Sequence, residues 1–366
     1  MTGLRKIVII TSEFPPEPGG IGNHAYNLAH HLSKNQFRVT VVADQRNNND
    51  KDQLSFDKRQ NFEIVRIALR KFRFFMYIQR IISVFRTVRK NDIVVASGKF
   101  SLWSVALATF FFKRKCIAVI HGFEVNFKKS YLKKSINRSL KRFDTVIAVS
   151  NYTMSLVKNL QLKRIEVIPN GFEKFTNFDL VDKKLIGSPS LITVGSVTDR
   201  KGQKNIIKAL PYLLKKFPKL SYHVVGKPVQ KEAFMLLAKS LNIEEHIFFH
   251  GAVSEQRKYE LLKGATIFVM LSEETNTGDV EGFGIALIEA NSLGLPAIGS
   301  KNCGIEDAIK NYSSGILIDR KNAKEFGRAI EIILNDYESY NNNSKIWASN
   351  FTWDLIIKKY IKTILN

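Results

Sequence analysis

The sequence predicts an α/β protein built from two parallel sheets, each wound with helices on both faces. Short apolar runs of strand length alternate with helix-length segments along the whole chain, which is typical of parallel sheets with crossover helices. A glycine-rich loop joins the first of these runs to a helical pattern. The chain has 366 residues, of which 45% are hydrophobic and 24% charged, as expected for about two globular domains.

The first half begins with the predicted strand Lys6–Thr11. The loop Gly19–Gly22 follows, and apolar residues at helical spacing then run from Ala25 to Leu32. Further strands are predicted at residues 39–43, 62–67, 93–96, 116–120 and 145–149.

The second half starts after the turn Ile168–Gly171 and a polar stretch that ends at Gly187-Ser188-Pro189. A strand at 190–195 then opens a second alternation. Its other strands are predicted at 220–225, 247–250, 266–271 and 295–300, and its helices at 203–216, 231–241, 255–263 and 283–293.

Several classes of protein are disfavoured. The apolar run after Met1 is too short for a signal peptide, and the stretch 101–112 is too short to span a bilayer. Cys116 and Cys303, the only two cysteines, form neither a disulfide framework nor a zinc site. These features predict a cytoplasmic protein.

The net charge of +23 is unevenly distributed: residues 51–150 hold 22 Lys and Arg against 6 Asp and Glu. Such a segment attracts nucleic acid, anionic membranes or phosphorylated ligands. Charge alone does not choose among these partners.

The loop Gly19-Gly20-Ile21-Gly22 lies where a first parallel strand passes into a helix. Backbone N–H groups there can approach a phosphate at the helix N-terminus. The spacing is not that of a dinucleotide fingerprint, which disfavours a nicotinamide enzyme. The alternative is a tight turn without a ligand.

The stretch Glu281–Glu289 carries two carboxylates eight positions apart, with glycines at 282 and 284. On a helix that begins near Phe283, both acids can face one ligand, and the open backbone N–H groups suit a diphosphate or a sugar. Burying Glu289 on an apolar helix is costly unless it binds something. The alternative is a structural carboxylate that already has a partner.

These features resemble the retaining family 4 glycosyltransferases of GT-B fold, whose signature is a Glu, seven residues, then Glu. The resemblance extends over nearly the whole chain. Its further motifs are the loop at 19–22, His121–Glu124, Val149–Thr153, Ile168–Gly171, Val194–Ser196 with Arg200–Gly202, Phe248–Ser254 and Phe351–Trp353.

The resemblance implies a role for each matching residue. Lys201 would neutralise the donor diphosphate, Glu289 would hold the ribose, and Glu281 with the backbone of residues 282–285 would grip the transferred sugar. His121 would contact the donor sugar or the acceptor and be needed for activity; a core histidine that ends a strand is the alternative. The implied donor-binding set is Gly19, Gly20, Ser196, Arg200, Lys201, Val253, Glu281, Gly282, Phe283, Gly284, Ile285 and Glu289.

One residue departs from the family pattern. Relatives usually carry an Arg directly after the glycine that aligns with Gly195, where it pairs with the diphosphate; this chain has Ser196. Arg200 could partly replace the missing charge.

The implied fold is two facing Rossmann-like domains with a donor and acceptor cleft between them. One domain would comprise residues 1–175 plus 350–366, and the other, the donor domain, residues 176–349. The implied reaction moves a hexose or N-acetylhexosamine from a UDP- or GDP-sugar to an acceptor hydroxyl with retention, without a metal or cofactor. A lipid-linked or cell-envelope glycan, as in polysaccharide or lipopolysaccharide biosynthesis, is the expected acceptor.

Rival readings remain open. A phosphorylase or nucleotide-sugar epimerase of the same fold would use the same cleft without a sugar acceptor. A nucleic-acid-binding protein would use the basic segment, which has no recognisable binding module. Asp50-Lys51-Asp52 spells the D-x-D of metal-dependent transferases but sits in an Asn-rich loop, and we interpret it as chance. His24, His30 and His31 lack partners at metal-ligand spacing.

The basic segment predicts a peripheral protein on the inner face of the cell membrane. Leu132, Ile136, Leu140 and Phe143 form an apolar stripe that a crossover helix would bury on its own sheet. The basic residues around them, with the aromatic-rich stretch 72–78, would remain free to contact anionic headgroups. The exposed cations of this helix are expected to be Lys133, Lys134, Arg138, Lys141 and Arg142.

Overall fold

The computed structural model describes residues 5–16, 19–45, 51–69, 72–174 and 183–366. The chain forms two compact units: unit 1 comprises Met1–Gly171 with Trp353–Asn366, and unit 2 comprises Phe172–Thr352. The boundaries that we predict after residues 175 and 349 stay predictions, and the first of them lies outside the described residues.

Unit 1 contains a parallel sheet that has seven strands among the described residues, in the order β3-β2-β1-β4-β5-β6-β7. The central strands are runs of β-branched residues, and Ile7, Val8 and Ile9 are fully buried. The strands are β1 (Lys6–Thr11), β2 (Arg38–Asp44), β3 (Glu63–Ile67), β4 (Ile93–Ser97), β5 (Lys115–Ile120), β6 (Thr145–Ala148) and β7 (Ile165–Val167).

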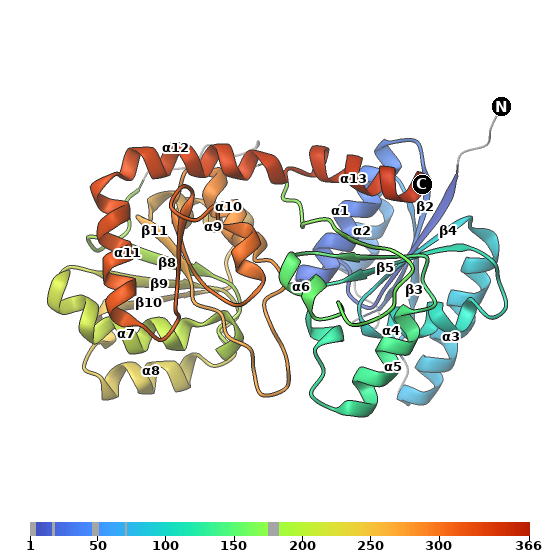
Figure 1. The fold of residues 1–366 in the computed structure, drawn as a ribbon, viewed down its shortest axis with the longest axis horizontal. Coiled ribbons are helices and arrows are strands. Elements are labelled where there is room, and N and C mark those ends of the chain that lie inside the picture. The colour runs from blue at the N-terminus through green and yellow to red at the C-terminus, as the bar shows by residue number, and fades with distance from the viewer. Residues whose placement is uncertain (1–4, 17–18, 46–50, 70–71, 175–182) are drawn as a thin grey trace. The chain divides into compact units, whose positions relative to one another are not determined.

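Helices cover both faces of this sheet, with α1 and α13 on one face and α3, α4 and α5 on the other (Figure 1). The helices of unit 1 are α1 (Gly20–Lys34), α2 (Lys51–Lys58), α3 (Arg73–Lys90), α4 (Lys99–Ala108), α5 (Ser130–Leu140), α6 (Asn151–Ser155) and α13 (Trp353–Leu365). The last of these packs Trp353 and Tyr360, each 1% exposed, into the core of unit 1. A Cβ atom on Gly171 would lie 2.9 Å from the Trp353 ring, so only glycine fits beneath it.

Unit 2 repeats the architecture with a parallel sheet of six strands in the part of the chain that the structure describes, in the order β10-β9-β8-β11-β12-β13. The strands are β8 (Ser190–Val194), β9 (Ser221–Val225), β10 (Ile247–Gly251), β11 (Ile267–Met270), β12 (Ala297–Ser300) and β13 (Gly315–Ile318). The helices are α7 (Gln203–Lys216), α8 (Lys231–Ser240), α9 (Glu255–Gly264), α10 (Ile285–Ser292), α11 (Ala323–Asn335) and α12 (Tyr337–Ala348). Helices α7 and α8 lie on one face, and α9 and α10 on the other (Figure 1).

The predicted α/β class with two Rossmann-like sheets is confirmed, as are the strands expected from apolar runs. In each sheet the strand order reverses between two central strands, β1 and β4 in unit 1 and β8 and β11 in unit 2. Loops after the carboxyl ends of such strands are where this class of sheet binds ligands. The residues singled out by sequence follow these strands.

Candidate functional site

The loops after β8 and β11 bring three of the predicted donor residues together in unit 2. Arg200 and Lys201 form a 3₁₀ turn, η2 (Asp199–Lys201), shortly after β8, and Glu281 follows β11. The two strands are neighbours and parallel, so both loops leave the same edge of the sheet. Residues 80 positions apart in sequence thus become contacting side chains.

Glu281 is shared by two cations. Lys201 Nζ lies 2.8 Å from Glu281 Oε2, and Arg200 Nη1 donates to the same oxygen. Arg200 Nε also lies 3.1 Å from Asp279 Oδ2. The side chains of Lys201 and Glu281 are 14% and 10% exposed, so these charges meet largely out of water, where pairing is strong.

These contacts decide the charge of the carboxylate. Burial by itself would raise the pKa of Glu281, but Lys201 and Arg200 hold that pKa below its usual value. Burial lowers the pKa of Lys201, and the nearby Glu281 opposes that effect. The pKa of Arg200 is raised, above all by Glu281. The contacts therefore favour the charged forms of Glu281 and Arg200.

The path of the Lys201 side chain depends on a glycine. Gly195 has φ +150°, and a Cβ atom there would lie 2.9 Å from Lys201 Cε and 3.1 Å from Cδ. Gly226 backs this loop, since its own Cβ would lie 2.1 Å from the Gly195 carbonyl oxygen. The two glycines allow the ammonium group to reach Glu281.

Ser196, where relatives usually have Arg, lies half-buried in the same loop, and its carbonyl accepts a hydrogen bond from Gln203 at 3.1 Å. A serine side chain cannot supply the cation. Arg200 reaches Glu281 beside Lys201, which places a guanidinium next to the predicted phosphate lysine. That Arg200 compensates for Ser196 stays a prediction with this geometry in its favour.

The loop from Gly282 to Ile285 is held from behind. Gly304 N–H donates to the Glu281 carbonyl at 3.0 Å, and a Cβ on Gly304 would lie 2.0 Å from the Gly282 oxygen. Phe283 is 1% exposed and packs against Phe351. Gly284, with φ +91°, precedes α10, which begins at Ile285 rather than near Phe283. The first N–H groups of a helix have no partner within it, so they suit an anionic or sugar ligand.

Glu289 has a partner that the sequence did not reveal. Lys258, on α9, places Nζ 3.2 Å from both Glu289 oxygens and 2.9 Å from Glu255. Burial raises the pKa of Glu289, and Lys258 counters part of that effect. The argument that a buried Glu289 must await a ligand is therefore weaker, although its side chain is still 19% exposed. Its predicted contact with ribose stays untested.

Val253 lies between β10 and α9, two strands from β8 in the sheet order. Ser254 beside it caps α9 by accepting a hydrogen bond from the Arg257 N–H at 3.2 Å. The position is half-buried and at the same edge of the sheet as Gly195.

In unit 1 the predicted histidine ends strand β5. His121 Nε2 lies 2.9 Å from Ser97 Oγ, and its backbone N–H donates to Glu124 Oε1 at 2.5 Å. The ring of His24, from α1, meets His121 edge to face at a centroid distance of 5.1 Å. His24 Nε2 in turn lies 2.9 Å from the Tyr360 hydroxyl of α13.

Both histidines are neutral at physiological pH. Burial lowers the pKa of His121 to about 4. Burial, followed by the neighbouring His121, lowers the pKa of His24 well below its usual value. A neutral His121 can hold or exchange a proton through Nε2 or Nδ1, and burial disfavours its charged form. His24 and Tyr360 are contacts that sequence reasoning missed.

Gly19 and Gly20 start helix α1 in unit 1, with Gly19 as the extended residue before it. A Cβ on Gly19 would lie 2.6 Å from Glu13 Oε2, whereas a Cβ on Gly20 would meet nothing within 4 Å. Gly20 is exposed. Its lack of a side chain has no packing cause among the described neighbours, which leaves a ligand approach as a physical reason for it.

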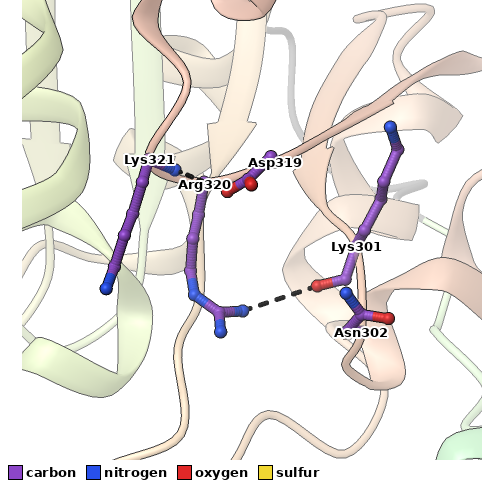
Figure 2. A pocket seen from close by; sticks show the side chains of 5 residues that line it. All are labelled: Lys301, Asn302, Asp319, Arg320 and Lys321. Atoms are coloured by element: carbon purple, nitrogen blue, oxygen red, sulfur yellow. Dashed lines mark hydrogen bonds between the residues drawn. The ribbon is translucent and has the colours of Figure 1, made fainter.

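A further cavity of about 400 Å³ opens in unit 2 where β12 and β13 end (Figure 2). It is lined by Lys301, Asn302, Asp319, Arg320 and Lys321. The Arg320 guanidinium reaches toward the Lys301 carbonyl at 3.5 Å, and Lys301 Nζ pairs with Glu325 at 2.7 Å. This cavity includes none of the residues predicted from sequence.

Two family models match consecutive parts of the chain. The model described as glycosyltransferase family 4 matches residues 18–174, and the model described as glycosyl transferases group 1 matches residues 180–347. The chain is 22% identical to a GDP-mannose-dependent alpha-(1-6)-phosphatidylinositol monomannoside mannosyltransferase of Mycobacterium tuberculosis, over 97% of each chain.

Solved structures share the fold. A sucrose-phosphate synthase of Thermosynechococcus elongatus is 17% identical, with a TM-score of 0.80 over 98% of each chain. HepE of Anabaena, in complex with UDP and glucose, is also 17% identical with a TM-score of 0.80, over 99% of this chain and 100% of that one.

Proposed function

The chain belongs to the GT4-type glycosyltransferases of GT-B fold, and from this premise we propose that it moves a hexose or N-acetylhexosamine from a nucleoside diphosphate sugar to an acceptor hydroxyl with retention of anomeric configuration. The observation that carries the proposal is the cluster of Lys201, Arg200 and Glu281 at the carboxyl edge of the second sheet. Cations at that edge suit a diphosphate, and the glycine loop beside them suits a sugar.

The chemistry follows from where charge develops. When the glycosidic bond to the diphosphate breaks, negative charge gathers on the leaving phosphate. Lys201 and Arg200 would stabilise that charge, aided by the N–H groups that open α10. Diphosphate oxygens would compete with Glu281 for both cations, and the carboxylate released from them would accept hydrogen bonds from sugar hydroxyls. We assign His121 to the acceptor or donor sugar.

The donor and the mode of reaction are tested directly. Purified protein is incubated with UDP- and GDP-sugars and an acceptor, and the anomeric configuration of the product is read by NMR. Retained configuration supports the proposal, and inversion contradicts it. Isomerised or phosphate-cleaved donor in the absence of acceptor would instead indicate an epimerase or phosphorylase.

We propose that neither metal nor cofactor is needed, so EDTA should leave the rate of transfer unchanged. Activity that is lost in EDTA and restored by Mn²⁺ or Mg²⁺ would contradict this.

We propose a lipid-linked or cell-envelope acceptor at the inner face of the cell membrane. A similar protein, the M. tuberculosis enzyme, is named for a phosphatidylinositol mannoside acceptor. In the described parts of the chain, no helix is long and apolar enough to cross a bilayer. Ile136 and Leu140 of the α5 stripe are fully buried, which confirms that this stripe packs on its own sheet, while Lys133 and Lys134 are exposed.

We assign the basic surface of unit 1 to a membrane rather than to nucleic acid. Apolar side chains of α3 lie exposed among its cations: Phe74, Phe75 and Ile82 are 68%, 58% and 45% exposed. Isolated apolar residues are ordinary on surfaces, but a helix face of them beside cations is typical of interfacial membrane contact. A gel shift at physiological salt tests the rival: specific retention of RNA or DNA would contradict the assignment.

A further inference from the structure

A cavity of about 640 Å³ lies in unit 1 where β5 and β6 begin. We call it the β5–β6 cavity. It is at the edge of the sheet opposite to His121, because His121 follows the carboxyl end of β5 whereas Lys115 starts that strand. Six cationic side chains line it, together with the carboxylate of Asp144: they are Lys113, Arg114, Lys115, Lys141, Arg142 and Lys163.

The fold uses only some of these cations. Lys163 pairs with Asp144 at 2.8 Å, and Lys115 Nζ donates to the carbonyls of Thr363 and Ile364 at 3.0 and 2.9 Å. Arg114 donates to the Arg89 carbonyl at 3.0 Å. These bonds explain why those three residues are basic, and they leave the cavity strongly positive.

Helix dipoles do not neutralise the positive charge of the cavity. Helices α4, α5 and α13 end near the cavity, and each helix end carries roughly half a negative charge. The six cations are offset by one carboxylate and by about one and a half charges from the three helix ends, which leaves a net charge of about +3.5. Burial lowers the pKa of Lys115, and the neighbouring Arg164 lowers it further. A bound anion would reduce the repulsion among these cationic side chains.

The rim of the cavity is apolar and exposed. Phe110 and Phe111 follow α4 and are 68% and 67% exposed, and Leu107 is 42% exposed. The Arg142 guanidinium lies over the Phe110 ring, 3.6 Å from its centroid. Aromatic side chains beside a cationic cavity match a bilayer interface, where rings enter the headgroup layer and cations meet phosphates.

Helix α3 extends this rim. The rings of Phe85 and Phe111 pack together with a distance of 5.3 Å between their centroids, which joins α3 to the residues after α4. Along the exposed face of α3, Phe75, Ile78 and Ile82 are followed at steps of three and four by Arg86 and Arg89. Between Glu63 and Asp92 the sequence has eight Lys and Arg and no acidic residue. The surface therefore complements an anionic bilayer over a wide area.

We propose that the β5–β6 cavity binds the phosphate headgroup of an anionic phospholipid while Phe110 and Phe111 enter the interface, so that unit 1 is held on the membrane. The inference rests on the proposed function in that both place the protein at a membrane, whereas the cavity itself lies at the edge of the sheet opposite to His121 and does not hold the acceptor. It differs from general adsorption of a basic protein, since a defined cavity carries the binding.

The test compares two variants that remove the same charge from unit 1. The cavity variant is Lys113→Ser/Lys141→Ser/Arg142→Ser, and the matched control is Lys133→Ser/Lys134→Ser/Arg138→Ser, on the exposed face of α5 outside the cavity lining. Partition onto phosphatidylglycerol vesicles is measured by co-sedimentation. We expect the cavity variant to bind about a hundredfold more weakly and the control to change several-fold at most. Equal losses in both variants would overturn the proposal in favour of diffuse attraction.

A second arm separates lipid from soluble phosphate. Phe110→Ser/Phe111→Ser should weaken vesicle binding by about tenfold, because two rings no longer enter the interface. In thermal-shift measurements, inorganic phosphate should stabilise the wild type more than the cavity variant, which keeps only the phosphate site proposed around Lys201. If the Phe110/Phe111 variant binds vesicles as tightly as the wild type, and phosphate still stabilises the wild type, the cavity is a site for soluble phosphate. That result would contradict the lipid assignment.

Activity measurements keep this inference apart from the proposed function. With a water-soluble acceptor and no vesicles, the cavity variant should transfer sugar at the wild-type rate, because the cavity and His121 lie at opposite edges of the sheet. If the protein transfers sugar normally but its vesicle binding does not depend on the cavity, only the lipid site is contradicted. If vesicle binding depends on the cavity but no donor supports transfer, only the proposed reaction is contradicted.

Discussion

Lys201 Nζ lies 2.8 Å from Glu281 Oε2, and Arg200 donates to the same oxygen. One carboxylate thus holds in place two cations that a diphosphate would need. A bound donor would exchange partners with this cluster rather than meet unpaired charges, so the cations are already positioned before the donor arrives.

The position of the second cation can be tested by moving it. Arg200→Ala should weaken binding of UDP or GDP by about 10- to 100-fold, since a charged hydrogen bond to phosphate is lost. Adding Ser196→Arg to that variant should restore part of the affinity, because it returns a cation to the position usual in relatives. Isothermal titration calorimetry gives both constants. Lys204→Ala is the control, because the half-exposed Lys204 lies 3.6 Å from Asp199; an equal loss there would refute a specific role for Arg200.

Loss of either partner in the central pair should stop turnover without unfolding the protein. Glu281→Ala and Lys201→Ala should each reduce the rate of transfer by about a hundred- to a thousandfold, since each removes a preorganised electrostatic contact. Circular dichroism should show an unchanged fold. Exposed Glu338→Ala on α12 serves as the control. Near-normal rates in both site variants would mean that the site lies elsewhere.

Lys258 should set the pH dependence of nucleotide binding. Lys258→Leu removes the cation that opposes the raised pKa of Glu289, so that pKa should rise further. The carboxylate is then protonated at higher pH, and UDP or GDP affinity should fall more steeply than in the wild type as the pH is lowered from 8 toward about 5. Lys258→Arg should restore the wild-type profile, and Lys263→Leu on the same helix is the control. Parallel profiles for all three variants would show that Glu289 does not contact the nucleotide.

Substitutions at two glycines at the start of α1 distinguish a packing role from a ligand-binding role. A Cβ on Gly22 would lie 3.1 Å from the Glu13 carbonyl carbon, whereas a Cβ on Gly20 meets nothing within 4 Å. Gly22→Ala should therefore lower the melting temperature, and Gly20→Ala should keep it or raise it, because alanine favours a helix by up to about 1 kcal/mol. A drop in activity for Gly20→Ala at unchanged stability would identify a ligand approach; full activity would remove Gly20 from the site.

His121 should make unit 1 less stable in mild acid. Its pKa in the folded chain is about 4, below the value of about 6.5 for an unfolded histidine. The unfolded state therefore binds the proton first, so this stabilisation is complete above pH 6.5 or so and is lost as the pH falls toward 4. Urea denaturation at a series of pH values measures the slope. His121→Gln should flatten it, and an unchanged slope in that variant would contradict the burial of a neutral His121.

Most strands could be predicted because each is a run of apolar, often β-branched residues between turn signals. Strands β7 and β13 were missed: Ile165–Val167 is only three residues long and half-exposed, and Gly315–Ile318 is only four residues long and begins with a glycine. Side-chain reach was harder still. Two contacts, that of Arg200 with Glu281 and that of Lys258 on α9 with Glu289 on α10, depend on how the loops leave neighbouring strands. The sequence has 56 Lys and Arg residues, and nothing in it distinguishes Lys258 from the others.

Contacts over long separations were also beyond the sequence. His24 and Tyr360 are 336 positions apart, and only the return of α13 to unit 1 places the hydroxyl 2.9 Å from the ring. The family resemblance predicted the return of a last helix but not which side chains it delivers. His24 looked like one of three unpaired histidines on a helix, and its contact with His121 follows from packing alone.

The return of α13 also has a consequence for how the chain is made. Residues up to Gly171 leave the ribosome first, yet unit 1 lacks Trp353 and Tyr360 until the chain beyond unit 2 has been synthesised. Unit 2 is continuous, so all of its strands and helices emerge before α13 does. Although the N-terminal part of a multidomain chain usually folds first during translation, here the surface under Trp353 and Tyr360 stays uncovered while unit 2 is translated. We expect nascent chains stalled before Trp353 to have a protease-resistant unit 2 and a protease-sensitive unit 1.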